Sequence, residues 1–157
     1  MRILSPFLLL LFSFSSFAAT VDTFEVFSTV MNKQIKNIVI TPATYTAEEQ
    51  TFPTVYLLHG AFGNHKDWLS KVPVIQDYAD QHGIIIVCPN GGYNTWYFDS
   101  PIDPSTQYET YVAKELVAAV DSQYRTQPLK GKRAITGLSM GGHGALYLCF
   151  RHQDTRH

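Results

Sequence analysis

The sequence has little charge, and the charge that it has is balanced. Of its 157 residues, 12 are lysine or arginine, 13 are aspartate or glutamate, and charged residues make up only 16% of the chain. No run of like charge occurs, which argues against a basic surface for nucleic acid and against a charged, disordered tail. We therefore expect neither nucleic acid nor an anionic membrane surface among the partners of the folded domain.

Cysteine is also scarce, because only Cys88 and Cys149 are present. We predict no zinc site, because neither cysteine stands in a metal-ligand spacing pattern, and we expect no other metal and no cofactor. Each cysteine lies in an apolar run, where a free cysteine behaves as a small hydrophobic residue. In an oxidising compartment the two could instead form one disulfide, and the sequence leaves both alternatives open.

Beyond its N-terminus the chain lacks any apolar run close to the roughly 18 residues that a transmembrane helix needs. One shorter run, residues 3–12, follows Arg2 and precedes small residues that end in Ser16-Phe17-Ala18. This pattern is typical of a secretory signal peptide cleaved after Ala18, with an uncleaved anchor as the alternative. We expect residues 1–18 to be the signal peptide, residues 19–157 to form one domain, and the location to be secreted or periplasmic.

Apolar periodicity and turn residues divide residues 19–157 into strands and helices. Strands are predicted at residues 23–29, 34–41, 54–58, 84–88 and 133–138, and helices at 73–82, 106–124 and 140–151. The first two strands suggest an antiparallel pair, whereas the later ones are short apolar runs typical of a buried parallel sheet. Thr106 and Glu109 predict a capping box. Alternating strands and helices predict an α/β fold with a mostly parallel, doubly wound sheet in a three-layer sandwich.

Residues 134–148, AITGLSMGGHGALYL, place a Gly-x-Ser-x-Gly sequence between a predicted strand and a predicted helix. Gly137 and Gly141 flank Ser139, as a sharp strand-to-helix turn requires if it is to raise the serine hydroxyl above the sheet edge. We therefore predict that Ser139 is a catalytic nucleophile. A tight turn that contains a serine but carries no chemistry is the alternative.

A tetrahedral oxyanion formed by attack of Ser139 would need two amide donors. The first is the N–H of Met140, which begins the helix and points out without a helical partner. The second is expected in the loop after the strand at residues 54–58, LLHGAFGNHKDW. We assign it to the N–H of Ala61, with Phe62 as the neighbouring possibility.

Other residues of these loops are candidates for contact with a substrate or for support of the loop. We expect His59 to order its loop by hydrogen bonding rather than to act as a base, and His65 and Asp67 to lie in a solvated turn. The aromatic residues after the strand at 84–88 could line an acyl or aryl pocket, or equally be hydrophobic cover. The residues predicted to line the substrate site are His59, Gly60, Phe62, Trp96 and Tyr97.

Three segments in this order, VYLLHGAFGNHKDW, NTWYFDSP and RAITGLSMGGHGALYL, resemble the esterase D branch of the α/β-hydrolases. That branch includes S-formylglutathione hydrolases, feruloyl and acetyl esterases, and mycolyltransferases, and the resemblance extends over residues 24–154. It implies the N-terminal part of an α/β-hydrolase fold, a nucleophile at Ser139, oxyanion donors at Ala61 and Met140, and small or glycan-linked carboxylic esters as substrates. Acyl transfer to a sugar or alcohol, and a non-catalytic module that binds a glycan or a partner, are the alternatives.

The acid and the base of a catalytic triad follow the nucleophile in this fold, yet only residues 140–157 come after Ser139. A 12-residue helix is about 18 Å long and would carry His152, Asp154 and His157 away from the serine. His143 lies one turn along that helix, without a carboxylate beside it. We expect the triad acid and histidine to be absent, the strand of Ile135 to be an uncovered edge, and the chain to be a truncated, nearly inactive esterase. The candidates for these roles are His143, His152, Asp154 and His157.

Overall fold

The computed structural model describes residues 18–46 and 49–153. The predicted signal peptide therefore falls outside the described residues, except for Ala18. Asp154 and His157 fall outside them as well. None of the helices in the described ranges is long and apolar enough to cross a membrane.

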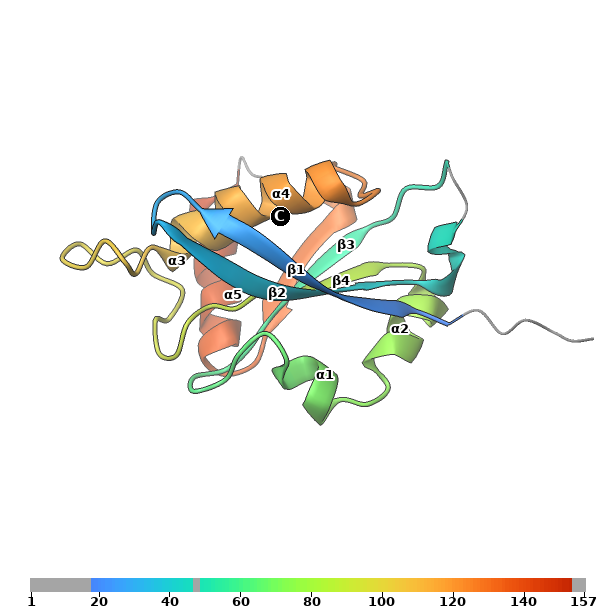
Figure 1. Ribbon diagram of the computed structural model, residues 1–157, viewed down its shortest axis with the longest axis horizontal. Helices are drawn as coiled ribbons and strands as arrows, with labels where there is room; N and C mark the ends of the chain where they lie inside the picture. Colours follow the sequence, from blue (N-terminus) through green and yellow to red (C-terminus); the bar gives the residue numbers. More distant parts are fainter. Residues whose placement is uncertain (1–17, 47–48, 154–157) are drawn as a thin grey trace, which may run out of the picture.

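One five-stranded sheet forms the middle layer, with the strand order β1-β2-β4-β3-β5 (Figure 1). The strands are β1 (Thr20–Ser28), β2 (Lys33–Thr41), β3 (Thr54–Leu58), β4 (Ile85–Cys88) and β5 (Arg133–Gly137). β1 and β2 pair antiparallel, as predicted, and β2 pairs antiparallel with β4. β3 pairs in parallel with β4 on one side and with β5 on the other. All four residues of β4 are buried, as an apolar run in the interior of a sheet predicts.

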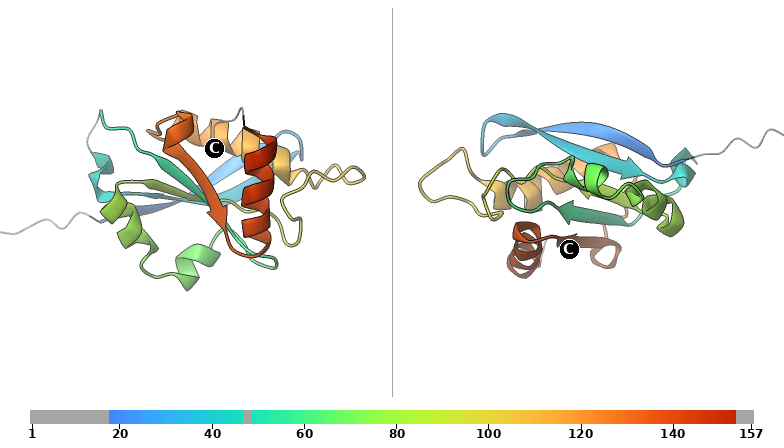
Figure 2. Two further views of the ribbon diagram at one scale, coloured as in Figure 1. Left: turned by 180° about the vertical axis from the view of Figure 1, so that it is seen from behind. Right: turned by 90° about the horizontal axis from the view of Figure 1, so that it is seen from below.

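Helices cover both faces of this sheet (Figures 1 and 2). On one face, α1 (Asp67–Lys71) and α2 (Ile75–His82) pack on side chains of β2 and β4. On the other, α3 (Tyr108–Thr110), a π-helical turn (Tyr111–Leu116), α4 (Val117–Gln123) and α5 (Met140–Arg151) enclose the larger core. Short 3-10 turns lie at Ala43–Thr46 and Lys130–Lys132. The predicted three-layer α/β architecture is confirmed.

The predicted capping box at Thr106 and Glu109 is wrong. The hydroxyl of Thr106 donates to the Oδ2 of Asp103, 2.8 Å away, and the helix that follows has no side-chain cap. Glu109 is buried and accepts hydrogen bonds from α5 and the residue after it: the Tyr147 hydroxyl at 2.7 Å, and Arg151 Nε and His152 Nε2, each at 2.8 Å. Burial opposes ionisation of Glu109, but these donors lower its pKa. Long-range partners have replaced the local cap.

β5 lies at the edge of the sheet formed by the described residues, as predicted for the strand of Ile135. Its Ala134 and Thr136 are exposed, and Leu146 and Phe150 of the adjoining α5 are also exposed. Cys88 and Cys149 are both free in this structure. Burial raises the pKa of the Cys88 thiol to about 12, so this thiol stays protonated and behaves as a core residue.

Candidate active site

Ser139 occupies the turn between β5, which ends at Gly137, and α5, which begins at Met140. Its backbone has φ 55° and ψ −118°, a conformation that residues with a Cβ rarely adopt. The side chain is exposed and caps no amide of α5. The structure therefore confirms the strained strand-to-helix turn that the sequence predicts, with the serine hydroxyl free to meet a ligand.

Glycines let this turn lie directly against the end of β3. A Cβ built on Gly137 would lie 2.7 Å from the carbonyl oxygen of Leu58, and one built on Gly141 would lie 2.7 Å from that of His59. A Cβ on Gly60 would lie 3.6 Å from the Cβ of Ser139. Because these neighbours are mostly backbone atoms that cannot move aside, the close approach depends on glycine at both positions of the turn.

Among the described residues, the loop after β3 leaves one amide without a partner and bonds another to the loop after β4. The N–H of Phe62 donates to the carbonyl of Tyr93, 2.6 Å away, and Phe62 itself has φ 64°. In the described part of the chain, neither the N–H of Ala61 nor that of Met140 has a hydrogen-bond partner. Between the two alternatives of the sequence analysis, the free amide is therefore that of Ala61.

His59 orders this loop, as predicted. Its Nδ1 lies 2.7 Å from the carbonyl oxygen of Gly60, and its Nε2 accepts the N–H of Gly91 at 2.9 Å. These partners fix the neutral tautomer with the proton on Nδ1. The ring is almost fully buried, and this burial lowers the pKa of His59. Its Nδ1 is bonded within the loop after β3, and its Nε2 is bonded to the loop after β4.

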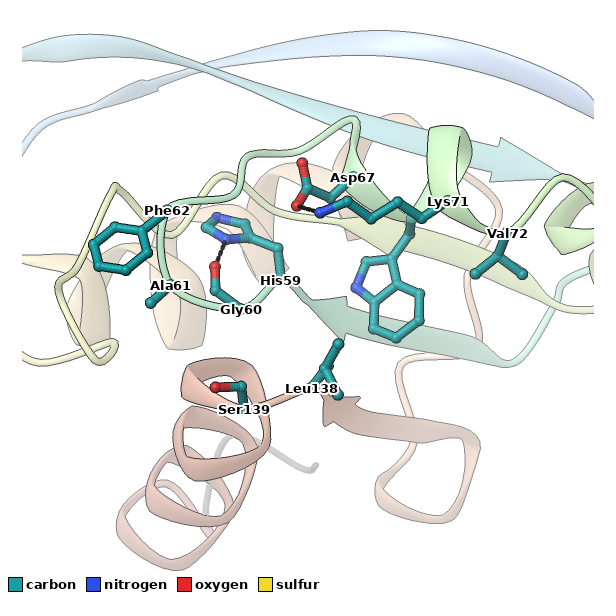
Figure 3. A pocket seen from close by; sticks show the side chains of 10 residues that line it. His59, Gly60, Ala61, Phe62, Asp67, Lys71, Val72, Leu138 and Ser139 are labelled. Carbon is teal, nitrogen blue, oxygen red and sulfur yellow. Dashed lines mark hydrogen bonds and ion pairs between the residues drawn. The ribbon is translucent and has the colours of Figure 1, made fainter.

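A cavity of about 400 Å³ adjoins Ser139, and we refer to it as the Ser139 pocket (Figure 3). The turn contributes Leu138 and Ser139 to its lining, and the loop after β3 contributes residues 59–62 (Figure 3). The opposite wall comes from α1 and the residue that follows it. All lining residues are His59, Gly60, Ala61, Phe62, Asp67, Trp68, Lys71, Val72, Leu138 and Ser139.

Two predictions about the loop after β3 are wrong. His65 is buried, 9% exposed, and neither of its ring nitrogens has a hydrogen-bond partner within the described residues. Burial, followed by the nearby Lys66, lowers its pKa. Asp67 begins α1 and its Oδ2 pairs with Lys71 Nζ at 2.6 Å; partial burial opposes ionisation, but that bond lowers the pKa of Asp67. Trp68 and Leu69 of α1 pack against the core on this face of the sheet, so the segment is not a solvated turn.

The prediction that Tyr97 lines the substrate site is also wrong. Tyr97 has no exposed surface, and its ring lies beneath the loop after β3. Trp96 is 42% exposed but does not line the Ser139 pocket. It packs edge-on against His143, with the ring centroids 5.3 Å apart. The physical reason is that both residues have positive φ, 54° and 60°, which turns their side chains in directions that the sequence does not indicate.

None of the described histidines is hydrogen-bonded to the Ser139 hydroxyl, and among them only His59 lines the Ser139 pocket. The ring nitrogens of His59 are occupied, and His65 does not line the pocket. His143 has its ring among Trp96, Phe98 and Tyr147, while His152, at the far end of α5, bonds Glu109. Across residues 18–46 and 49–153, no histidine, cysteine, aspartate or glutamate side chains gather into a group that could hold a metal ion.

A family model described as "Putative esterase" matches residues 28–155. The chain belongs to this esterase family. An esterase of Mycobacterium tuberculosis is 34% identical over 112 residues, which are 69% of this chain and 24% of that protein. A diacylglycerol acyltransferase/mycolyltransferase of Mycobacterium gordonae is 30% identical over 151 residues, 90% of this chain and 42% of that protein.

Among solved structures, a ferulic acid esterase superposes on this esterase-family chain with a TM-score of 0.79 at 33% identity. The match covers 90% of this chain and 56% of that one. The chain thus spans less than half the length of the two curated relatives named above and just over half of this solved structure.

Sequence reasoning missed the wall of the pocket that this esterase-family chain builds from Trp68, Lys71 and Val72. The indole Nε1 of Trp68 donates to the carbonyl of Leu58, 3.0 Å away, and so fixes the wall to the end of β3. α1 has only five residues, too few to show the apolar period of a helix. The one available signal was a tryptophan beside a glycine-rich loop.

Proposed function

We propose that this chain carries the nucleophile and the oxyanion-binding amides of a serine ester hydrolase. Ser139 attacks the acyl carbonyl, and the N–H groups of Ala61 and Met140 receive the negative charge that develops on its oxygen. The observation that carries this proposal is the strained backbone of Ser139, held beside two amides without partners and a pocket of about 400 Å³. Membership of the esterase family supports it.

The reaction would follow the acyl-enzyme route. The Ser139 oxygen bonds to the carbonyl carbon, the tetrahedral intermediate collapses, and the alcohol departs with a proton. Water then attacks the acyl-serine, releasing the carboxylic acid and restoring the hydroxyl. Each half-reaction needs a general base within about 3 Å of the attacking oxygen, and the described residues offer none.

We therefore propose that the 157-residue chain by itself is a weak catalyst. Loss of the triad histidine costs about a 10⁶-fold reduction in turnover, whereas oxyanion binding alone preserves about 10³- to 10⁴-fold acceleration over water. Slow hydrolysis that still uses Ala61 and Met140 is the expected behaviour.

The Ser139 pocket favours a small ester with an apolar part. Its volume lies within the range of about 300 to 1,000 Å³ that small-molecule sites occupy. Trp68, Val72 and Leu138 give it an apolar wall, and the pair of Asp67 and Lys71 adds a polar edge. The similarity to a ferulic acid esterase supports a carboxylic ester, whether free or attached to a glycan.

Covalent trapping tests this function. The purified chain is incubated with p-nitrophenyl acetate, and acetylated peptides are identified by mass spectrometry. We expect acetylation at Ser139, its loss in Ser139→Ala, and no change in Ser122→Ala, which alters an exposed serine on α4. Acetylation that is spread over surface residues and insensitive to Ser139→Ala would contradict the proposal. Turnover at ordinary enzymatic rates would contradict the proposal that the chain is a weak catalyst.

Acyl transfer is the second candidate, favoured by the similarity to a mycolyltransferase over 90% of the chain. Hydrolysis and transfer differ only in whether water or another hydroxyl attacks the acyl-serine. Product analysis with glucose or glycerol added as acceptor separates them: ester formed on the acceptor indicates transfer, and free acid alone indicates hydrolysis. A soluble chain that binds glycans but never acylates Ser139 would instead indicate a non-catalytic module.

Secretion to the periplasm or beyond stays a proposal that rests on residues 1–18. N-terminal sequencing of the protein recovered from the medium or periplasm tests it. Cleavage after Ala18 is the expected result, and an intact Met1 on an exported protein would contradict it.

A further inference from the structure

Trp96 and Tyr97 form an unusual pair, because two consecutive residues with side chains both have positive φ. This conformation is unfavourable for residues with a Cβ and persists only where the surroundings impose it. Its effect is to send the two side chains apart. Tyr97 becomes fully buried, whereas Trp96 stays 42% exposed.

The buried ring of Tyr97 fits between two glycines from different parts of the fold. A Cβ built on Gly91, in the loop after β4, would lie 2.7 Å from the Tyr97 oxygen. A Cβ built on Gly144, in α5, would lie 2.8 Å from the Cγ of the ring. Any side chain larger than hydrogen at either position would overlap the ring. Tyr97 is therefore in direct contact with the helix that begins just after Ser139.

The hydroxyl of Tyr97 joins a third segment to this arrangement. It donates to the carbonyl of His59, 3.1 Å away, in a buried hydrogen bond. That carbonyl lies two residues before the free amide of Ala61. The Nε2 of His59 accepts the N–H of Gly91, 2.9 Å away, and so bonds this loop to the loop after β4. One side chain thus connects the loop of Ala61, the loop after β4 and α5.

We propose that Tyr97 is a positioning residue that sets the Ala61 amide relative to the Met140 amide and Ser139. It contacts neither the pocket nor Ser139 and acts through the carbonyl of His59 and through α5. The consequence for function rests on the proposed function, since it assumes that the Ala61 amide binds the oxyanion. The structural part, that the hydroxyl holds the loop in place, does not depend on catalysis.

Tyr97→Phe tests the structural part, because it removes the hydroxyl and keeps the ring between its glycines. Amide hydrogen exchange is followed by NMR in the full chain, with Tyr78→Phe on the exposed side of α2 as the matched control. We expect exchange at Phe62 and Gly91 to rise about five- to tenfold, as loss of one hydrogen bond predicts. The β4 amide of Val87 should be unchanged. An equal rise at Val87, or none at Phe62 and Gly91, would overturn the proposal.

Residual hydrolysis of p-nitrophenyl acetate by the same variants tests the functional part. Tyr97→Phe should lower kcat severalfold with KM unchanged, because a displaced Ala61 amide weakens oxyanion binding but leaves the pocket intact. A change in KM alone would overturn the assignment to oxyanion positioning. If the wild-type chain shows no hydrolysis above background, the proposed function fails for this chain, while the exchange experiment still decides the role of Tyr97.

Discussion

Replacing Ser139 with glycine should stabilise the chain, whereas replacing it with alanine should not. The Ser139 backbone, at φ 55° and ψ −118°, is sterically unfavourable because of its Cβ. Alanine keeps the Cβ and therefore keeps the strain. The hydroxyl caps no amide of α5 and lies exposed, so its removal alone should change the free energy of unfolding by less than about 0.5 kcal/mol.

The size of the effect follows from two opposing contributions. Relief of a strained φ/ψ pair contributes on the order of 1–3 kcal/mol. Glycine also increases the conformational entropy of the unfolded chain, which lowers the free energy of unfolding by about 0.5–1 kcal/mol. Ser139→Gly should therefore be more stable than Ser139→Ala by roughly 0.5–2 kcal/mol. For a chain of this size that corresponds to a Tm higher by roughly 1–8 °C.

Urea unfolding followed by circular dichroism measures the difference, and pulse proteolysis provides an independent ranking. The matched control is position 122, near the end of α4, where the backbone is helical and glycine costs up to about 1 kcal/mol relative to alanine. The order of stability should thus reverse between positions 139 and 122. If glycine is no more stable than alanine at position 139, the strain assigned to the Ser139 turn is not real.

Three further predictions follow from the packing. Gly141→Ala should cost about 1–3 kcal/mol in urea unfolding, since its Cβ would meet immobile backbone. Gly142→Ala, whose Cβ would lie 3.3 Å from the Gly137 carbonyl oxygen, should cost less. Burial lowers the pKa values of His59 and His65, so as the pH falls these two histidines become protonated in the unfolded chain before they do in the folded one. The free energy of unfolding should therefore be highest above about pH 6.5 and decrease below it, which urea unfolding at pH 5 and pH 7.5 measures. Glu109→Ala should cost about 1.5–3 kcal/mol by thermal unfolding, as its donors lose their acceptor.

Much of the fold could be predicted because its strands are short apolar runs between turn residues. The structure begins β4 at Ile85, one residue later than predicted, and places α5 at the predicted bounds. The failures have a common cause. α1 is a single short helix without a readable period, and the sequence predicts a local cap at Glu109 although its partners lie about 40 residues away in the chain. Local patterns cannot predict interactions that only the folded sheet brings together.

The site divides in the same way. The strained turn at Ser139 and the unpaired amides of Met140 and Ala61 could be predicted because they follow directly from the ends of β5 and β3. Trp68 and Tyr97 could not, because the direction of each side chain depends on how its segment packs. An aromatic-rich loop indicates that rings are present but not which ring faces the pocket and which is buried beneath it.

The strand order explains why the candidate site lies where it does. β3 lies between β4 and β5, all three run in parallel, and Leu58 pairs with Gly137 at the ends of their strands. The loops that leave β3 and β5 therefore start at the same level and must meet. The loop after β4 meets the same edge from the other side, where Gly91 reaches His59. The strand order alone therefore brings these three loops together. The strained turn of Ser139 and the unpaired amide of Ala61 depend instead on a few residues within those loops.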